Sequence, residues 1–385
     1  MPLFSKKSPI STELIFDIES DSVCAAIVLY EANKVPHIVY HAESEIGRKV
    51  HTDGAYLLKN MLKALEMAAA DAQKALVSLL EKKTIEHSAV NRIHIVLSSP
   101  WIISKLSCVE KVFEEETIIR HKDAADLLEK ERDASAKLFA IGDSAAIDAK
   151  LFEVKINGYP VTVYEGKHAK ALEGTMVVSF ASRKMLSEIK LRVNKSFRAR
   201  DEAFHSALIL RYITLRSILP HHVDYVWLQI HGELTDVLFV REGECAVSAS
   251  LPFGYDTLVR RFASLTGESE QIAVSSLVLS ENGSNTAEAA NATGASLEKI
   301  MAEWTSGITR LVSLGEESAL PPIVYVSTGK YSFVFESALR RFSQSISVRK
   351  AAPDIVASFV EYAPSVSVDV SASLYAAALP LSQKL

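Results

Sequence analysis

Hydrophobic and polar positions set out the same arrangement twice, in the stretches 14–43 and 225–254. In each stretch, short apolar runs follow one another and are separated by polar turns. Apolar runs of strand length that are bounded by turn residues predict antiparallel strands joined as a meander. The expected strands are Leu14–Ile18, Val23–Tyr30, His37–Tyr40, Val226–Ile230, Val237–Val240 and Ala246–Leu251. Two such meanders, far apart in the chain, predict a core built from two matched halves.

After each meander the pattern changes to helical spacing and then returns to a strand. Residues 54–82 are rich in Ala and Leu at helical spacing and predict one long helix, which a buried strand follows at Ile93–Leu97. In the second half a strand is expected at Ile323–Val326, and residues 281–294, which lack large apolar side chains, are expected to form a mobile loop. The helices expected there are 256–265, 268–279, 296–314, 333–342 and 371–379.

The segment between the halves, 105–198, breaks this repeat and predicts an α+β insertion. Its clearest signal is Asn157-Gly158 between two apolar runs, the residue pair typical of a tight hairpin. A charged helix is expected at 121–138, and a helix at 202–219 is expected to return to the main body. The predicted division is therefore a flexible tail at 1–12, a first half at 13–104, the insertion at 105–198 and a second half at 199–385.

Composition and charge narrow the possible functions. A chain of 385 residues is expected to form more than one domain, and its net charge of −5 gives no bulk attraction to nucleic acid. Its 3 cysteines lie far apart, without the spacing of a zinc site or a disulfide framework. No apolar segment follows the basic N-terminus, and Pro380 is expected to break the last helix. These features predict a cytoplasmic protein without direct membrane insertion.

Three turns carry the candidate chemistry. They read Asp17-Ile-Glu-Ser-Asp-Ser-Val-Cys24, Gln229-Ile-His-Gly-Glu-Leu-Thr-Asp236 and Val326-Ser-Thr-Gly-Lys-Tyr331. With the matched halves and the insertion, these turns make the chain resemble the actin-like ATPase superfamily, and within it the FtsA and PilM family of cell division and type IV pilus assembly. The resemblance covers essentially the whole chain after residue 12. It implies duplicated actin-like (ribonuclease H-like) α/β domains with an inserted SHS2-like α+β subdomain that binds partners.

The resemblance also implies ATP and Mg²⁺ as cofactors and assigns roles to individual residues. Asp17 would act in the metal-water shell and, with Asp236, in catalysis. Thr328 and Gly329 would lie on the base side of the nucleotide. The remaining nucleotide-binding candidates are Ser20, Ser22, Gly232, Thr235 and Asp236. The alternative interpretation is that Asp17 and Asp236 cap turns, although the duplicated layout favours a location in the nucleotide cleft, and His231 is interpreted as structural.

The turns also depart from the pattern that phosphate binding requires. Hairpin turns hold phosphates through bare backbone N–H groups, which is why glycine is favoured there. Here Glu19 stands in place of a glycine, Asp21 adds a second carboxylate, and Cys24 replaces a lysine. Two like charges about 4 Å apart repel by roughly 4 kcal/mol at an intermediate effective dielectric, and half of that weakens binding more than tenfold. A Mg²⁺ ion bound to these carboxylates would reverse the effect.

Three functions follow as hypotheses. The first is an actin-like scaffold that binds a partner peptide or self-assembles, with weak or no ATP hydrolysis. The second is an active Mg²⁺-dependent ATPase, and the third is a small-molecule kinase, for which no catalytic base is recognisable. The chain end has no basic amphipathic helix to lie on a membrane. This favours the pilus role over cell division, with recruitment to the inner face of the membrane by a membrane-protein partner.

Overall fold

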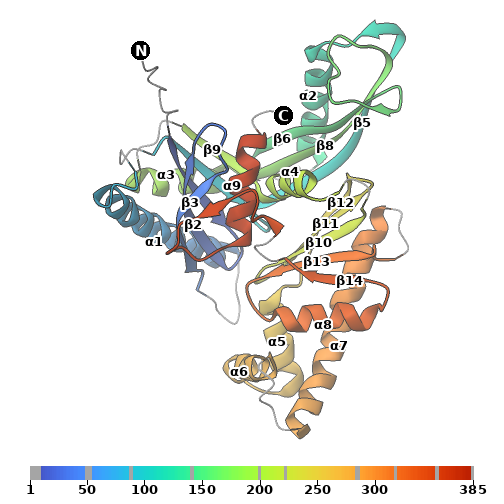
Figure 1. Ribbon diagram of the computed structural model, residues 1–385. Coiled ribbons are helices and arrows are strands. Elements are labelled where there is room, and N and C mark those ends of the chain that lie inside the picture. The colour runs from blue at the N-terminus through green and yellow to red at the C-terminus, as the bar shows by residue number, and fades with distance from the viewer. Residues whose placement is uncertain are drawn as a thin grey trace.

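Two mixed β-sheets form the body of the protein, and a third sheet stands out from it as a separate lobe (Figure 1). The computed structural model describes residues 10–47, 54–85, 90–138, 143–197, 201–220, 223–281, 287–315, 319–351 and 355–382.

The two body sheets share one topology. The first has the order β15-β3-β2-β1-β4-β9 and the second β12-β11-β10-β13-β14. In each, the first meander strand pairs antiparallel with the second and parallel with the strand after the helices. Their bounds are β1 Ser11–Ile18, β2 Ser22–Tyr30, β3 His37–Glu45, β4 Arg92–Leu97, β9 Asp201–Ser206, β15 Glu361–Tyr362, β10 Tyr225–Ile230, β11 Thr235–Arg241, β12 Glu244–Leu251, β13 Ile323–Thr328 and β14 Ser347–Lys350. The predicted meanders and matched halves are confirmed.

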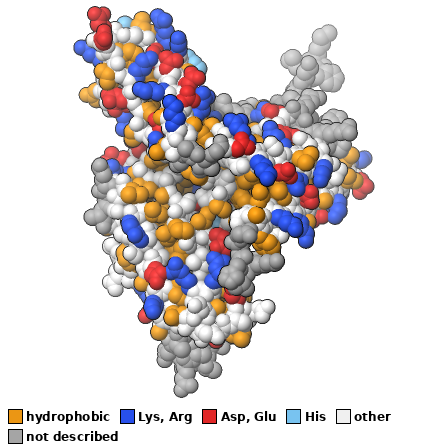
Figure 2. All heavy atoms as spheres, turned by 180° about the vertical axis from the view of Figure 1, so that it is seen from behind, with side chains coloured by type: hydrophobic (Ala, Val, Ile, Leu, Met, Phe, Trp, Pro, Cys, Tyr) orange, Lys and Arg blue, Asp and Glu red, His pale blue; other side chains and the backbone are white. Residues whose placement is uncertain are grey.

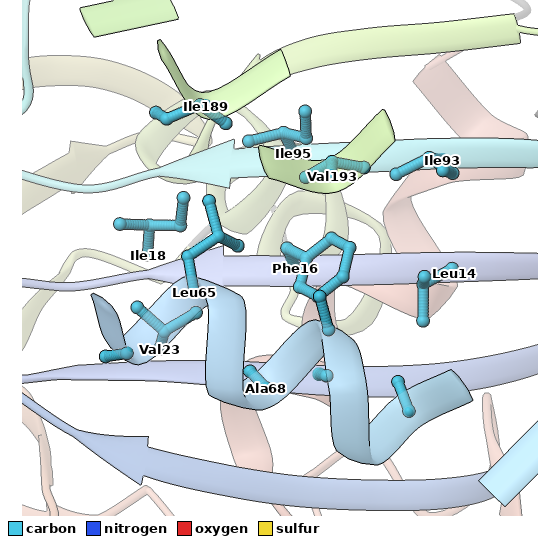
Figure 3. Close-up of a cluster of buried hydrophobic side chains, with 14 of the residues drawn as sticks. Leu14, Phe16, Ile18, Val23, Leu65, Ala68, Ile93, Ile95, Ile189 and Val193 are labelled. Carbon is cyan, nitrogen blue, oxygen red and sulfur yellow. The ribbon is translucent and has the colours of Figure 1, made fainter. Parts of the chain in front are cut away.

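Helices cover the outer face of each sheet. Helices α1 (Gly54–Glu81) and α3 (Arg183–Ser196) cover the first sheet, and Figure 3 shows Leu65 and Ala68 of α1 close to Phe16 of β1. Helices α5 (Tyr255–Thr266), α7 (Ala287–Val312) and α8 (Ser332–Phe342) cover the second, and α6 (Glu270–Glu281) packs on α5. These apolar faces explain the helical spacing seen in the sequence.

A central helix pair joins the two halves. Helices α4 (Ala207–Ile218) and α9 (Val370–Ser382) lie between the two sheets (Figure 1), and one core contains side chains of both helices and both sheets. Thr214 of α4 donates a hydrogen bond of 2.7 Å to the carbonyl of Leu374 in α9. A helix that is covered on several sides needs apolar residues all round, which accounts for the Ala-rich composition of α9.

The insertion has its own sheet of order β5-β8-β6-β7, on which helix α2 packs. The bounds are β5 Ile102–Ile118, α2 His121–Leu138, β6 Ser144–Ile156, β7 Tyr159–Pro160 and β8 His168–Ser182. The predicted hairpin turn is present, with φ of 51° at Asn157 and 81° at Gly158. Helix α3 comes after this sheet in the chain and packs on α1 in the core of the first half.

A buried polar chain crosses the first sheet. His94 of β4 lies between Glu13 of β1 and His205 of β9, with N–O and N–N distances of 2.7 Å and 3.0 Å. Burial lowers the pKa of His205 to about 3, and the nearby charges of His94, Lys150 and Arg92 act in the same direction. His205 is therefore neutral in the folded protein.

Four expectations need correction. The helix expected at 202–219 is wrong at its start, because Asp201–Ser206 pairs in parallel with β4 and only then does α4 begin. The loop expected at 281–294 is wrong from Ala287 onward, where α7 begins, while residues 282–286 lie outside the described residues. Alanine is the strongest helix former, so a helix does not need large apolar side chains there.

The other two corrections concern the chain ends. Helix α9 continues through Pro380 to Ser382, because a proline close to a helix end removes few backbone hydrogen bonds. Ser11 and Thr12 belong to β1 rather than to a tail, and residues 1–9 lie outside the described residues. Strands β14 and β15 were not expected, since runs this short carry no clear periodicity.

Candidate functional site

The candidate site lies where the β1–β2 turn of the first half meets the β10–β11 turn of the second. The β1–β2 turn comprises residues 19–21 and the β10–β11 turn residues 231–234. The register places Asp17 opposite Cys24 and Gln229 opposite Asp236, so Asp17 and Gln229 occupy matched places in the two halves. The sequence singled out these same two turns.

The two turns are bonded directly to each other. The backbone N–H of Gly232 donates to Oδ1 of Asp21 at 3.0 Å, and that of Glu233 donates to Oγ of Ser20 at 3.3 Å. The hydroxyl of Tyr255, at the start of α5, donates to Oδ2 of Asp21. Backbone donors of the second turn are therefore engaged by side chains of the first.

Close packing explains why glycine stands at position 232. A Cβ added there would lie 2.8 Å from Cβ of Asp21 and 2.7 Å from Oδ2 of Asp256. At Gly254 an added Cβ would lie 2.2 Å from the carbonyl oxygen of His231. All three distances are too short for non-bonded atoms, so Gly232 and Gly254 allow the close contact between the turns and α5.

His231 bridges two carboxylates from the two halves. Its Nδ1 lies 3.0 Å from Oε2 of Glu19, and its Nε2 lies 3.2 Å from Oδ2 of Asp236. Burial by itself would lower the pKa of His231, but the charge of Glu19 and the hydrogen bond to Asp236 raise it well above its usual value. Burial likewise favours a raised pKa for Asp236, yet His231 and the hydroxyl of Ser250 outweigh it and lower that pKa.

Asp17 is buried at the end of β1. Burial raises its pKa well above the usual range, with further contributions from Glu19 and Asp369. Its Oδ1 has no hydrogen-bond partner among the residues that the structure describes. Arg211 of α4 is also buried nearby, contributes positive charge to Asp17, and donates to the hydroxyl of Tyr375 at 2.9 Å. Burial thus disfavours the charged form of Asp17, which is the form that a metal ion would bind.

Of the other residues expected to bind nucleotide, Ser22 and Thr235 are buried, and Thr328 and Gly329 line an open cleft. Ser22 is buried at the start of β2, and the hydroxyl of Thr235 donates to the carbonyl of Phe253 at 2.6 Å and accepts from the indole of Trp304 at 3.1 Å. The hydroxyl of Thr328 donates to the carbonyl of Lys330 at 2.8 Å.

That cleft has a volume of about 620 Å³ and lies on the expected base side. Asp21 lines it together with the third turn, and Lys330 pairs with Glu45 across it at 2.9 Å. A Cβ added at Gly329 would meet no heavy atom within 4 Å. The expected base side thus has room for a ligand, whereas at the expected phosphate side the two turns are hydrogen-bonded to each other.

The sequence did not predict the contacts that join the two turns. Glu19 and Asp21 were expected to repel phosphate, but not to contact the other half. Their partners, His231 and Tyr255, had no assigned role in the chemistry. The available signal was complementary charge: an acidic turn in one half and a histidine in the matched turn of the other.

Comparisons with known proteins identify the fold. No family model and no curated protein matches the sequence. A PilM–PilN type IV pilus biogenesis complex matches with a TM-score of 0.63 at 12% identity, over 97% of this chain and 98% of the other. Apo psk41 ParM is also similar, with a TM-score of 0.42 at 10% identity over 97% of this chain and 98% of the other. A Bacteroides thetaiotaomicron VPI-5482 protein with an actin-like ATPase fold has a TM-score of 0.41 at 9% identity over 91% of this chain and 93% of the other.

The protein has an actin-like ATPase fold, with two matched α/β halves joined by a central helix pair. At the level of structure it is PilM-like. Both statements agree with the resemblance found in the sequence. Within the part of the chain that the structure describes, no helix has the length and apolar character needed to cross a bilayer.

Proposed function

We propose that this chain is an actin-like scaffold of a membrane-associated assembly, which binds a partner protein and hydrolyses ATP weakly or not at all. The assembly is of the type IV pilus kind, and the chain acts on the cytoplasmic side of the membrane, to which its partner recruits it. The proposal rests on the contact between the β1–β2 turn and the β10–β11 turn, in which Asp21 accepts a hydrogen bond from the backbone N–H of Gly232.

This contact supports the proposal because it uses the groups that nucleotide binding would need. In actin-like folds the phosphates are held by turn N–H groups, as the resemblance implies. Here a carboxylate takes one such donor and adds negative charge at the same place. A nucleotide would have to break the hydrogen bonds of Asp21 to Gly232 and Tyr255 and of Ser20 to Glu233 before its phosphates could enter.

Protein binding is supported by the similar structure and by the surface of the insertion. The similar PilM structure is a complex with PilN. In this chain the insertion is a separate lobe with apolar side chains among charged ones (Figure 2), and Val112 and Tyr159 are 70% and 76% exposed. We propose that a cytoplasmic peptide of a membrane protein binds this lobe, since exposed apolar and aromatic side chains commonly anchor protein interfaces.

An active Mg²⁺-dependent ATPase is the second candidate. The open cleft of about 620 Å³ beside Thr328 and Gly329 favours it, because an adenosine group would fit there without displacing the turns. In that case Asp17 and Asp236 would carry the metal and the catalysis, as in the resemblance.

Calorimetric titration with Mg-ATP, together with a phosphate-release assay, separates the two candidates. The scaffold is expected to bind Mg-ATP weakly and to release no phosphate above background. Low-micromolar binding with turnover that Asp236→Ala abolishes would establish the ATPase instead.

The partner is tested with cytoplasmic peptides of membrane proteins encoded beside this chain's gene. Fluorescence anisotropy should show binding that Val112→Asp and Tyr159→Ala weaken at least about tenfold, as expected for anchor residues. The control is Val77→Asp, an exposed apolar position on α1, which should leave binding unchanged. Equal loss in the control would place the partner elsewhere.

A further inference from the structure

Three side chains with metal-ligand chemistry meet between the two halves. Glu19 and Asp21 come from the first turn and His231 from the second, and we call them the cross-half cluster. One ligand atom from each lies within 4.8 Å of the others. No spacing in the sequence predicts this group, because His231 is far from the carboxylates along the chain.

The surroundings of His231 hold its ring in a ligand's orientation. Its Nε2 lies 3.2 Å from Oδ2 of Asp236, and Oδ1 of Asp236 accepts a hydrogen bond of 2.6 Å from Ser250. Histidines that ligate metals commonly donate their second ring N–H to a carboxylate held in this way. A metal ion would displace the proton on Nδ1, and the ring would keep its proton on Nε2, where Asp236 accepts it.

A second observation concerns the buried Nδ1 of His231. Nδ1 of His231 is completely buried, and within the described part of the chain it contacts Glu19 as an ion pair without the geometry of a hydrogen bond. The nearest carboxylate oxygen, Oε2 of Glu19, is 3.0 Å away. Two ligands of a tetrahedral zinc ion, with bonds of about 2.0–2.2 Å, are separated by about 3.3–3.5 Å. A shift of a few tenths of an ångström would place an ion between them.

We propose that the cross-half cluster binds a first-row divalent transition metal ion of the Zn²⁺ type without any nucleotide. Glu19, Asp21 and Nδ1 of His231 are its protein ligands, and water completes a tetrahedral shell. The hydrogen bonds of Asp21 to Gly232 and Tyr255 hold that carboxylate in place. The imidazole selects such ions over Mg²⁺, which prefers oxygen ligands and keeps its water.

The ion would fasten the two halves together at the place where a nucleotide would otherwise bridge them. Its ligands come from both turns, so binding requires the closed arrangement seen here. The inference goes beyond the scaffold function and does not depend on it, because the site is tested without partner or nucleotide.

The test uses the full-length chain, stripped with a chelator and dialysed. Co²⁺ is added as a spectroscopic probe, and Zn²⁺ affinity is measured by competition with a coloured chelator, with Mg²⁺ for comparison. We expect one ion per chain, visible absorption bands of tetrahedral Co²⁺, and Zn²⁺ binding far tighter than Mg²⁺ binding. Zn²⁺ should also raise the melting temperature, since it binds only the folded chain.

Variants identify the ligands. Glu19→Gln and Asp21→Asn should each weaken Zn²⁺ at least about tenfold, and Asp236→Asn should weaken it about 10–100-fold by releasing the histidine ring. The control is His168→Gln, which alters an exposed histidine of the insertion and should change nothing.

If His231→Gln does not fold, the partly exposed Glu19 and Asp21 decide the question. Absence of Co²⁺ bands in the folded protein would overturn the proposal. So would Zn²⁺ binding that survives both carboxylate variants, or Mg²⁺ binding of equal strength. The cluster would then be an ion pair and no metal site.

Discussion

Replacing Asp21 with alanine should increase the affinity for nucleotide. The carboxylate of Asp21 accepts a hydrogen bond of 3.0 Å from the backbone N–H of Gly232 and a second one from the hydroxyl of Tyr255. The substitution removes both a negative charge and the side chain that occupies this backbone donor. A phosphate group could then take the place of the carboxylate.

The size of the effect follows from the charge and the freed donor. A carboxylate about 4 Å from a phosphate charge repels it by roughly 4 kcal/mol at an effective dielectric of about 20. Because water reaches part of the turn and screens the charges, we take about half of this repulsion, roughly 2 kcal/mol, as the energy that the substitution removes. This energy corresponds to roughly a 30-fold change in affinity. A hydrogen bond from Gly232 to a charged phosphate adds to this gain. We therefore expect at least a tenfold increase.

The assay is calorimetric titration with Mg-ATP and Mg-ADP after removal of transition metals. Asp21→Asn should give a smaller gain than Asp21→Ala, because the amide oxygen still accepts from Gly232. The control is Asp71→Ala, an exposed aspartate on α1 that pairs with Lys74. Melting curves check that each variant is folded, since Tyr255 loses its acceptor.

Two results would refute this reasoning. If folded Asp21→Ala binds nucleotide no better than the wild type, the turn contact does not close the phosphate side. If affinity falls in Asp21→Ala and Asp21→Asn alike, the carboxylate holds Mg²⁺ and the chain is a working nucleotide site.

Three further predictions test the core and the buried charges. Leu65→Ala should lower the free energy of unfolding in urea by about 2–5 kcal/mol, because Leu65 is fully buried under the first sheet. Met67→Ala, at an exposed position of the same helix, should change it by no more than about 0.5 kcal/mol. Equal losses in the two variants would contradict the packing. His205 has a pKa lowered to about 3, so the unfolded chain takes up a proton that the folded chain does not as pH falls from about 6.5 toward 3. The free energy of unfolding should therefore drop by about 2–4 kcal/mol over this pH range, after allowance for residual exposure. His205→Gln should make the free energy of unfolding depend less steeply on pH. An unchanged pH dependence would mean that other groups cause it. Asp236→Ala should leave phosphate release at background. It should also lower the free energy of unfolding by about 3–5 kcal/mol, because it removes a buried ion-pair partner of His231. A melting curve equal to that of the wild type would contradict this ion pair.

Much of the fold was predictable because local pattern and tertiary role agree. The strands from Leu14 to Tyr40 and from Val226 to Leu251 are bounded by turn residues, and their burial in the structure matches their apolar character. Helix α1 carries both strong helix propensity and one buried face. Where the two signals disagreed, prediction failed.

The failures have specific physical causes. Asp201–Ser206 forms a strand because the edge of β4 offers unpaired backbone groups, which no local pattern reveals. Helix α7 begins at Ala287, in a stretch without the large apolar residues that mark a helical face in a sequence. Helix α9 tolerates Pro380 because its packing between the halves outweighs the local cost.

The sequence alone predicted two matched halves, an insertion between them and the two turns at the candidate site. It also showed that these turns carry Glu19, Asp21 and His231 in place of a simple glycine-rich pattern. Only the tertiary structure decided what those residues do, because their partners lie in the opposite half of the molecule. Charges that look unfavourable within one turn become hydrogen-bonded and paired when the other turn is brought beside them.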